Sequence, residues 1–148
     1  VSLASVDAAS FIKRYSMPYA FGGPPSLPAV GATVASARLH LGGVVRTLQY
    51  ALHKNIALFD SVLMAESINA GTTSPIRSIA IHDELFAINV SELLQKRGYA
   101  VTTAMYPTVK LGEAMIRVAI SASHSDKDIR GLAEAINSII EDRKKGSL

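Results

Sequence analysis

The chain has 148 residues, of which 49% are apolar and 18% are charged, a composition typical of one folded domain and not of a disordered tail. Lys and Arg number 15 and Asp and Glu number 12, which leaves a net charge of only +3. The basic residues are scattered and Trp is absent, so we expect no nucleic-acid partner. No apolar run approaches the about 18 residues that a membrane span needs, so we also expect no membrane span.

Cysteine is absent, which excludes disulfide bonds, thiolate metal sites and cysteine nucleophiles. This suits a reducing compartment, and we expect a cytoplasmic protein. Histidines occur at four positions, none of which has metal-ligand spacing to another histidine or to a helical carboxylate. We therefore predict no metal site, and we regard His124, which directly follows a predicted strand, as the only histidine with a candidate role.

Residues 1–25 are predicted to form a short helix and a connector. Asp7 can cap a helix over 8–15, because its carboxylate can accept backbone N–H bonds. The next ten residues, 16–25, contain two glycines and three prolines, which favour an extended segment with sharp turns. Gly22-Gly23 in this segment lacks the pattern of a dinucleotide-binding motif and is typical of a turn.

Residues 26–70 are predicted to form one long helix or a helix pair. Ser26 suits the N-cap position and Pro28 suits the first helical turn. Apolar residues then recur at helical spacing. Gly42-Gly43 marks a stop or a kink, after which a second helical pattern runs to about Asn69.

Residues 71–148 are predicted to form a small α+β domain. The expected helices lie over 84–96 and from Ser125 or Asp126 onward, and the expected strands lie at about 76–82, 99–106 and 114–122. A short turn joins the last two strands, which implies an antiparallel pair. We therefore expect a small, mainly antiparallel three-stranded sheet covered by helices, with the helices on one face.

Arg117 lies in the middle of the third predicted strand, in an otherwise apolar or small-residue segment. A charge in such a place is costly unless it is paired or exposed. One interpretation is an edge-strand arginine that faces solvent or pairs with Glu113 or Asp126. The other is a guanidinium that binds the carboxylate of a ligand. The residues alone leave both interpretations open.

The segment Tyr106–His124, with the sequence YPTVKLGEAMIRVAISASH, resembles the C-terminal signature of the α-oxoamine synthases. These enzymes depend on pyridoxal phosphate and have fold type I. Three further segments match the family in the same order along the chain. They are Tyr19–Pro25 before the long helix, Ser74–Ile76 at the first strand, and Gly98-Tyr99 before the second strand.

The resemblance implies a parent enzyme that condenses an amino acid with an acyl-CoA and releases carbon dioxide. It implies that Arg117 binds the carboxylate of the amino acid, and that His124 and Ser121 shape the site. It also implies a homodimer in which Gly22 and Gly23 approach the cofactor phosphate of the partner subunit. The family often has Ser or Thr there, so in this chain only backbone N–H groups remain for that contact.

The resemblance also implies that the family's Schiff-base lysine lies upstream of Val1. No lysine of this sequence lies in an apolar setting at a strand end, as an imine-forming lysine would. We therefore expect this chain to be part of a longer enzyme, with no catalytic residue of its own and no pyridoxal phosphate bound to it alone. Two alternatives are the small domain of a class I/II aminotransferase and a non-enzymatic α+β binding or assembly module.

Overall fold

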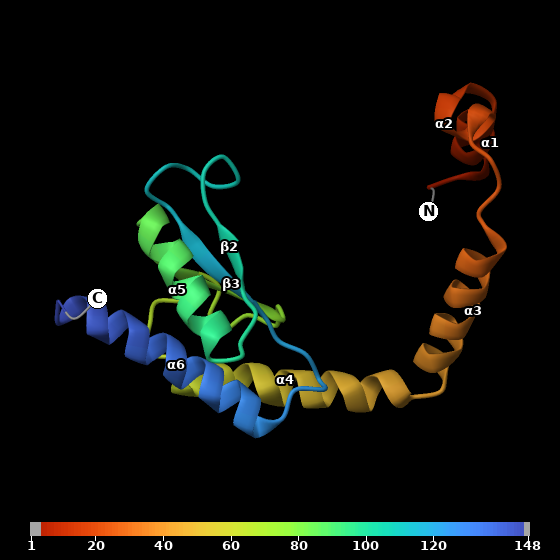
Figure 1. The fold of residues 1–148 in the computed structure, drawn as a ribbon. Helices are drawn as coiled ribbons and strands as arrows, with labels where there is room; N and C mark the ends of the chain where they lie inside the picture. Colours follow the sequence, from red (N-terminus) through yellow and green to blue (C-terminus); the bar gives the residue numbers. More distant parts are fainter. Residues whose placement is uncertain (1–3, 147–148) are drawn as a thin grey trace. The chain divides into compact units, whose positions relative to one another are not determined.

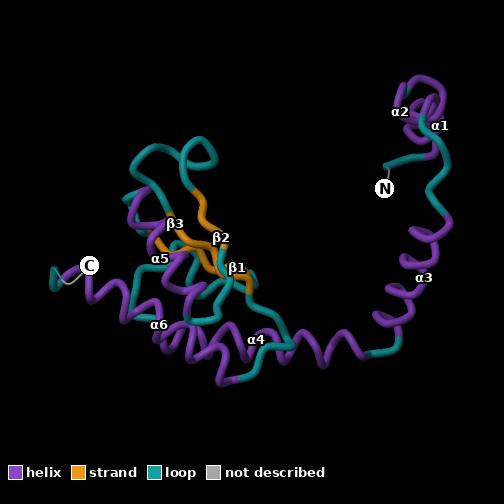
Figure 2. The backbone as a smooth tube through the Cα atoms, viewed as in Figure 1, coloured by secondary structure: helices purple, strands orange, loops and turns teal. Residues whose placement is uncertain are grey.

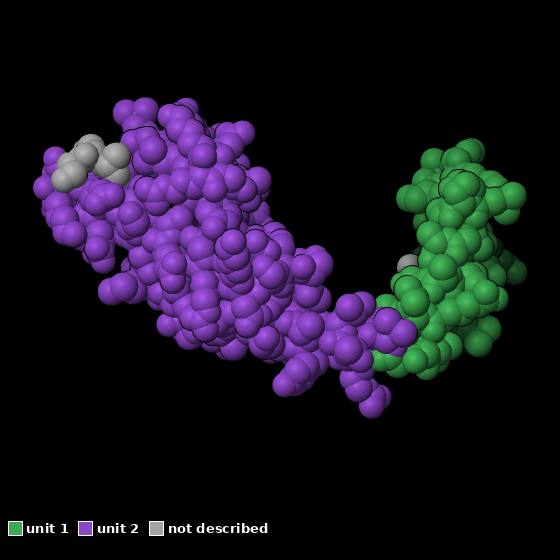
Figure 3. Space-filling model, turned by 60° about the horizontal axis from the view of Figure 1, so that its bottom comes forward, with its two compact units in different colours: residues 1–43 green, residues 44–148 purple. Residues whose placement is uncertain are grey.

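The computed structural model describes residues 4–146. The chain divides into two units, residues 1–43 and residues 44–148, which are coloured separately in Figure 3. We describe each unit by itself. The first three residues of the predicted connector and the last two of the predicted small domain lie outside the described residues.

Three helices form the first unit: α1 (Val6–Tyr15), α2 (Met17–Phe21) and α3 (Leu27–Leu41). Ser5, and not Asp7, caps α1, because its hydroxyl accepts the Ala8 N–H at 3.1 Å. Helix α2 occupies part of the segment that was predicted to be extended. It forms because Pro18 lies in its first turn, where a missing N–H is harmless, and it ends at Gly22, where an added Cβ would collide with the Pro18 carbonyl oxygen.

The described residues of the second unit form three helices and three strands (Figure 1). They are α4 (Val44–Val62), β1 (Ile76–Ala80), α5 (Glu84–Lys96), β2 (Thr102–Ala104), β3 (Met115–Ala119) and α6 (Asp126–Lys144). The strands form one antiparallel sheet in the order β1-β3-β2, so β3 is the central strand (Figure 2). The predicted α+β class with a three-stranded antiparallel sheet is confirmed.

The strands are shorter than the sequence pattern predicts, and local hydrogen bonds explain why. Tyr99 donates its backbone N–H to Leu94 at 2.9 Å, so it completes the end of α5 and does not begin a strand. Thr108 donates to Met105 at 2.8 Å, so a turn follows β2 directly. After β1, His82 adopts a positive φ of 65°, which turns the chain into α5.

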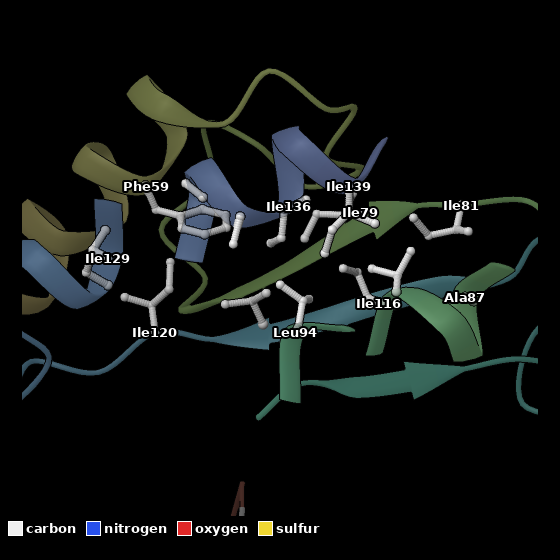
Figure 4. Packing of buried hydrophobic residues seen from close by; sticks show 14 of the residues in the cluster. Phe59, Ile79, Ile81, Ala87, Leu94, Ile116, Ile120, Ile129, Ile136 and Ile139 are labelled. Atoms are coloured by element: carbon white, nitrogen blue, oxygen red, sulfur yellow. The ribbon is translucent and has the colours of Figure 1, made fainter. Parts of the chain in front are cut away.

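The core lies between one face of the sheet and helices α4, α5 and α6. Ile116 and Val118 alternate with exposed or half-buried neighbours along β3, and Ile79 lies opposite Ile116 on β1. Figure 4 shows Phe59 of α4 and Ile136 and Ile139 of α6 packed against Ile79 and Ile116. All three helices therefore cover the same face, and the other face of the sheet has no helix of this unit on it.

A buried ion pair joins α4 to β1. The Arg77 side chain is fully buried, and its Nε and Nη2 donate to the two carboxylate oxygens of Asp60 at 2.6 and 2.8 Å. Its remaining N–H groups donate to the carbonyls of Thr72, Ser74 and Ile76. The guanidinium therefore has an acceptor for every donor, which is the condition under which a buried charge is tolerated. The hydrogen bonds from Arg77 also hold the pKa of Asp60 below its ordinary value of 3.8.

Replacing Asp60 should destabilise this unit strongly. We expect Asp60→Asn to lower the free energy of unfolding by about 3 kcal/mol at neutral pH, because Arg77 would stay buried without its counter-charge. The matched control is Asp126→Asn, whose partner Lys54 lies in an exposed ion pair with side chains 58% and 57% exposed, and which should change the stability by no more than about 1 kcal/mol.

The pH dependence gives a second check on the same variant. Because the folded-state pKa of Asp60 is lowered, its stabilisation is complete above the unfolded-state value and is lost as the pH falls through the folded-state value. The stability difference between the parent and Asp60→Asn should therefore be constant at neutral pH and shrink in acid. Urea unfolding over a pH series measures both effects. Equal losses for Asp60→Asn and Asp126→Asn would show that the ion pair contributes little.

Candidate functional site

Arg117 lies on the open face of the sheet, opposite the helices. The flanking residues Ile116 and Val118 are buried against the core, and Arg117 itself is exposed. Because successive side chains of a strand point to opposite faces, the guanidinium points away from the helix layer. Ser78 of β1 and Thr102 of β2 are its partners in register on either side. A charged group is thus flanked by two short hydroxyl side chains on the face of the sheet opposite the helices.

Two features of the first interpretation of Arg117, the edge strand and the acidic partner, are not found among the described residues, although Arg117 is exposed. Arg117 is not on an edge strand, because β3 is central. Glu113 pairs with Lys110 at 3.9 Å and Asp126 pairs with Lys54 at 3.0 Å, so neither proposed acid pairs with Arg117. Among residues 4–146, no salt bridge involves Arg117. Its guanidinium donors are therefore available to an external acceptor.

A tight turn follows β3 and carries the other two predicted residues, Ser121 and His124. The Ser121 backbone N–H donates to Nδ1 of His124 at 3.2 Å, and Ser121 Oγ accepts the Ser123 N–H at 3.1 Å. Ser125 then begins α6 with a reciprocal capping box, in which its hydroxyl accepts the Asp128 N–H. The hydroxyl and backbone N–H of Ser125 bind the Asp128 carboxylate and lower its pKa.

His124 lines a cavity of about 320 Å³ beside this turn. The cavity wall is formed by residues 98–100 before β2, by residues 118–120 at the end of β3, and by the first turns of α6. Arg117 and Ser121 are not in the wall. Ala119 of the wall lies two residues beyond Arg117 along β3, but the wall residues from α6 belong to the helix side of the sheet, whereas Arg117 points to the other side.

Gly22 and Gly23 lie in the first unit, at the end of α2, and both are exposed. The Gly22 N–H already donates to the Pro18 carbonyl at 3.0 Å. Of these two glycines, Gly23 has no backbone hydrogen bond from its N–H within the described residues.

Neither a metal site nor an activated lysine is found in the part of the chain that the structure describes. No cluster of three or more metal-ligating side chains occurs among residues 4–146. Every lysine, at positions 13, 54, 96, 110, 127, 144 and 145, is exposed to solvent. Within the same residues, no helix is both long enough and apolar enough to span a membrane.

Sequence reasoning missed two buried polar side chains, Arg77 and Asn55. A buried mid-strand charge needs a partner, and in this sheet the buried arginine is Arg77, whereas Arg117 is exposed. Asn55 was overlooked although the spacing gave a signal. It lies three residues after Leu52 and four before Phe59, so it is a polar residue within the apolar stripe of a helix.

Comparison with known proteins gives a consistent answer, although no family model matches the chain. The chain is 30% identical over 137 residues to 8-amino-7-oxononanoate synthase of Marinomonas sp. (strain MWYL1), which covers 92% of this chain and 34% of that protein. It is 32% identical over 127 residues to the mitochondrial 2-amino-3-ketobutyrate coenzyme A ligase of Bos taurus, covering 85% of this chain and 30% of that protein. The chain thus spans about a third of the length of these relatives.

Solved structures show the same fold. The 8-amino-7-oxononanoate synthase of Francisella tularensis superposes with a TM-score of 0.78 at 20% identity, over 95% of this chain and 41% of that one. A serine palmitoyltransferase of S. paucimobilis, with PLP and myriocin bound, gives 0.77 at 19% identity, over 94% of this chain and 35% of that one. The chain belongs to the α-oxoamine synthase family, whose members are pyridoxal-phosphate-dependent enzymes of fold type I, and it matches their C-terminal part.

Proposed function

We propose that this chain is the C-terminal part of an enzyme that condenses an amino acid with an acyl-CoA. In this reaction the α-carbon of the amino acid forms a bond to the thioester carbonyl carbon. The C–S bond breaks to release the coenzyme A thiol, and the α-carboxylate leaves as carbon dioxide. The names of the relatives support the reaction class, and they support it over a class I/II aminotransferase or a non-enzymatic module.

Arg117 carries the proposal for this part of the enzyme, as the residue that binds the carboxylate of the amino acid. It is an exposed arginine on a central strand, and it forms no salt bridge within residues 4–146. A guanidinium can bind both oxygens of a carboxylate at once, which fixes the orientation of the amino acid as well as its charge. In the turn at the end of the same strand, His124 would form part of the wall of the site, and Ser121 would hold the His124 ring through its backbone N–H.

Replacement of Arg117 by lysine tests this role. The change keeps the charge but removes the paired donors, so we expect at least a tenfold rise in the KM for the amino acid in the polypeptide that carries this chain. The stability should change little, because Arg117 is exposed and its loss leaves no buried partner. Arg130→Lys on α6, another exposed arginine, is the matched control and should leave the KM unchanged. Amino-acid-dependent release of coenzyme A measures the KM, and thermal unfolding measures the stability.

One outcome of that experiment would contradict the assignment. If Arg117→Lys unfolds the protein but the amino-acid KM of the folded fraction matches that of Arg130→Lys, then Arg117 is a structural residue. The carboxylate would in that case be bound by a different group.

Pyridoxal phosphate, when bound, supplies an electron sink for the carbanion that forms at the α-carbon of the amino acid. The residues of this chain fit only the edge of such a cofactor site. They offer the Gly23 backbone N–H toward the phosphate, whereas every lysine is exposed to water. We therefore propose that this chain alone does not hold the cofactor and that the Schiff-base lysine belongs to another part of the enzyme.

A spectroscopic titration tests the cofactor proposal. When the 148-residue chain is mixed with pyridoxal phosphate, we expect only the weak, non-saturating imine absorbance of surface lysines. A stoichiometric imine band that reaches a plateau and is lost when one particular lysine is replaced would contradict the proposal. Borohydride reduction followed by peptide mass spectrometry would identify the lysine responsible.

We also propose that the enzyme is a cytoplasmic homodimer in which Gly22 and Gly23 approach the cofactor phosphate of the partner subunit. Two features support this proposal. Large apolar side chains on the helices of residues 4–43, such as Phe11, Phe21 and Leu27, are exposed and suit an interface. The absence of cysteine suits a reducing compartment.

A further inference from the structure

Asn55 of α4 is one of two polar or charged side chains that are buried within residues 4–146, the other being Arg77. A buried amide lowers stability unless its N–H groups have acceptors. Both N–H groups of Asn55 have one, since Nδ2 donates to the carbonyl of Ser121 and to the carbonyl of His124, each at 2.9 Å. A single side-chain amide thus holds both ends of the turn that follows β3.

The same turn determines where the His124 ring carries its proton. Nδ1 of His124 lies 3.2 Å from the Ser121 backbone nitrogen. A backbone N–H can only donate, so Nδ1 must be the acceptor and cannot carry a hydrogen. The neutral ring therefore carries its proton on Nε2. The His124 backbone N–H closes the turn further by donating to the Ser121 carbonyl at 3.3 Å.

We infer that Asn55 is a positioning residue, which holds the Ser121–His124 turn so that His124 presents an Nε2–H donor at the wall of the 320 Å³ cavity. This inference rests on the proposed function, in which Arg117 on the preceding strand binds the carboxylate of the amino acid. The ligand group that suits this donor is a carbonyl or carboxylate oxygen of the bound substrate. Asn55 acts only through the turn, since it does not line the cavity.

The ion pair that the neighbouring residue Lys54 forms does not hold the Ser121–His124 turn as Asn55 does. Lys54 pairs with Asp126 at 3.0 Å, just beyond the turn, but both side chains are more than half exposed. Exposed ion pairs hold their partners weakly. The buried amide of Asn55 is therefore the contact that fixes the turn to the helix.

The test compares Asn55→Ala with Asn137→Ala. Asn137 of α6 is a matched control, because it also makes two bonds to backbone groups, donating to Val62 O at 2.9 Å and accepting from Met64 N at 2.8 Å. Both variants lose two such bonds, but only Asn55 contacts the His124 turn. Long-range ¹H–¹⁵N NMR of the 148-residue chain at alkaline pH, where histidine rings are neutral, identifies the protonated ring nitrogen of His124.

In the parent chain we expect His124 to be protonated at Nε2 and unprotonated at Nδ1. In Asn55→Ala the two ring signals should shift toward those of a free histidine, and the Ser121 amide should exchange with solvent at least tenfold faster than in Asn137→Ala. Asn137→Ala should keep the parent pattern. A parent ring protonated at Nδ1, an unchanged pattern in Asn55→Ala, or equal changes in both variants would overturn the inference.

Two further measurements keep the test decisive. If Asn55→Ala does not fold, the parent chain still shows whether His124 carries its proton on Nε2. Asn55→Ser, whose hydroxyl can donate only one hydrogen bond, then takes the place of Asn55→Ala in the comparison. In the polypeptide that carries this chain, Asn55→Ala should lower kcat/KM at least tenfold while Asn137→Ala changes it less than about twofold, and equal losses would overturn the positioning role. If the parent shows no acyltransferase activity, the proposed function fails, but the NMR comparison still decides the role of Asn55.

Discussion

A guanidinium that is removed from water must find an acceptor for each of its N–H groups, and this requirement organises residues 44–148. Arg77 finds those acceptors in the Asp60 carboxylate and in the carbonyls of Thr72, Ser74 and Ile76. The turn before β1 can therefore take only a conformation that directs these carbonyls inward. The arginine fixes where β1 begins, and β1 in turn sets the register of β3.

Helix α4 uses two polar side chains to hold the same end of the sheet. Asp60 holds the turn before β1 through Arg77, and Asn55 holds the turn after β3 through two carbonyls. The two turns are neighbours, because β1 and β3 are antiparallel and Ile120 donates to Pro75 at 2.8 Å. Arg117 lies two residues from that end of β3. Arg117 thus lies on a strand whose end is held by α4, and Ser121 and His124 lie in the turn to which Asn55 of α4 donates.

The sequence could predict the parts of this fold that depend on local periodicity. Helix α5 was predicted with its observed bounds, and the break at Gly42-Gly43 separates α3 from α4. The residues of β3 alternate as a strand pattern requires, with Ile116 and Val118 against the helices and Arg117 on the other face. The strand ends were wrong where local hydrogen bonds of helix ends and turns compete with the pattern, as at Tyr99.

Long-range polar contacts were not predictable in the same way. Asp60 and Arg77 are 17 residues apart and lie in different elements, and Asn55 contacts a turn more than 60 residues away. No local spacing encodes such pairs. The clue that was present, a polar residue in an apolar helical stripe, indicates only that a partner exists and not which one. Arg117 differs from these residues, because it has no salt-bridge partner within the described residues. Its position on a central strand could be recognised only from the strand order.

The most direct test of the carboxylate-binding role is a crystal structure of the polypeptide that carries this chain, with pyridoxal phosphate and an amino-acid substrate bound. We predict that both carboxylate oxygens lie within hydrogen-bond distance of the Arg117 guanidinium, on the open face of the sheet and beside Ser121–His124. A substrate carboxylate bound by a different residue, with Arg117 in contact only with solvent, would contradict the account.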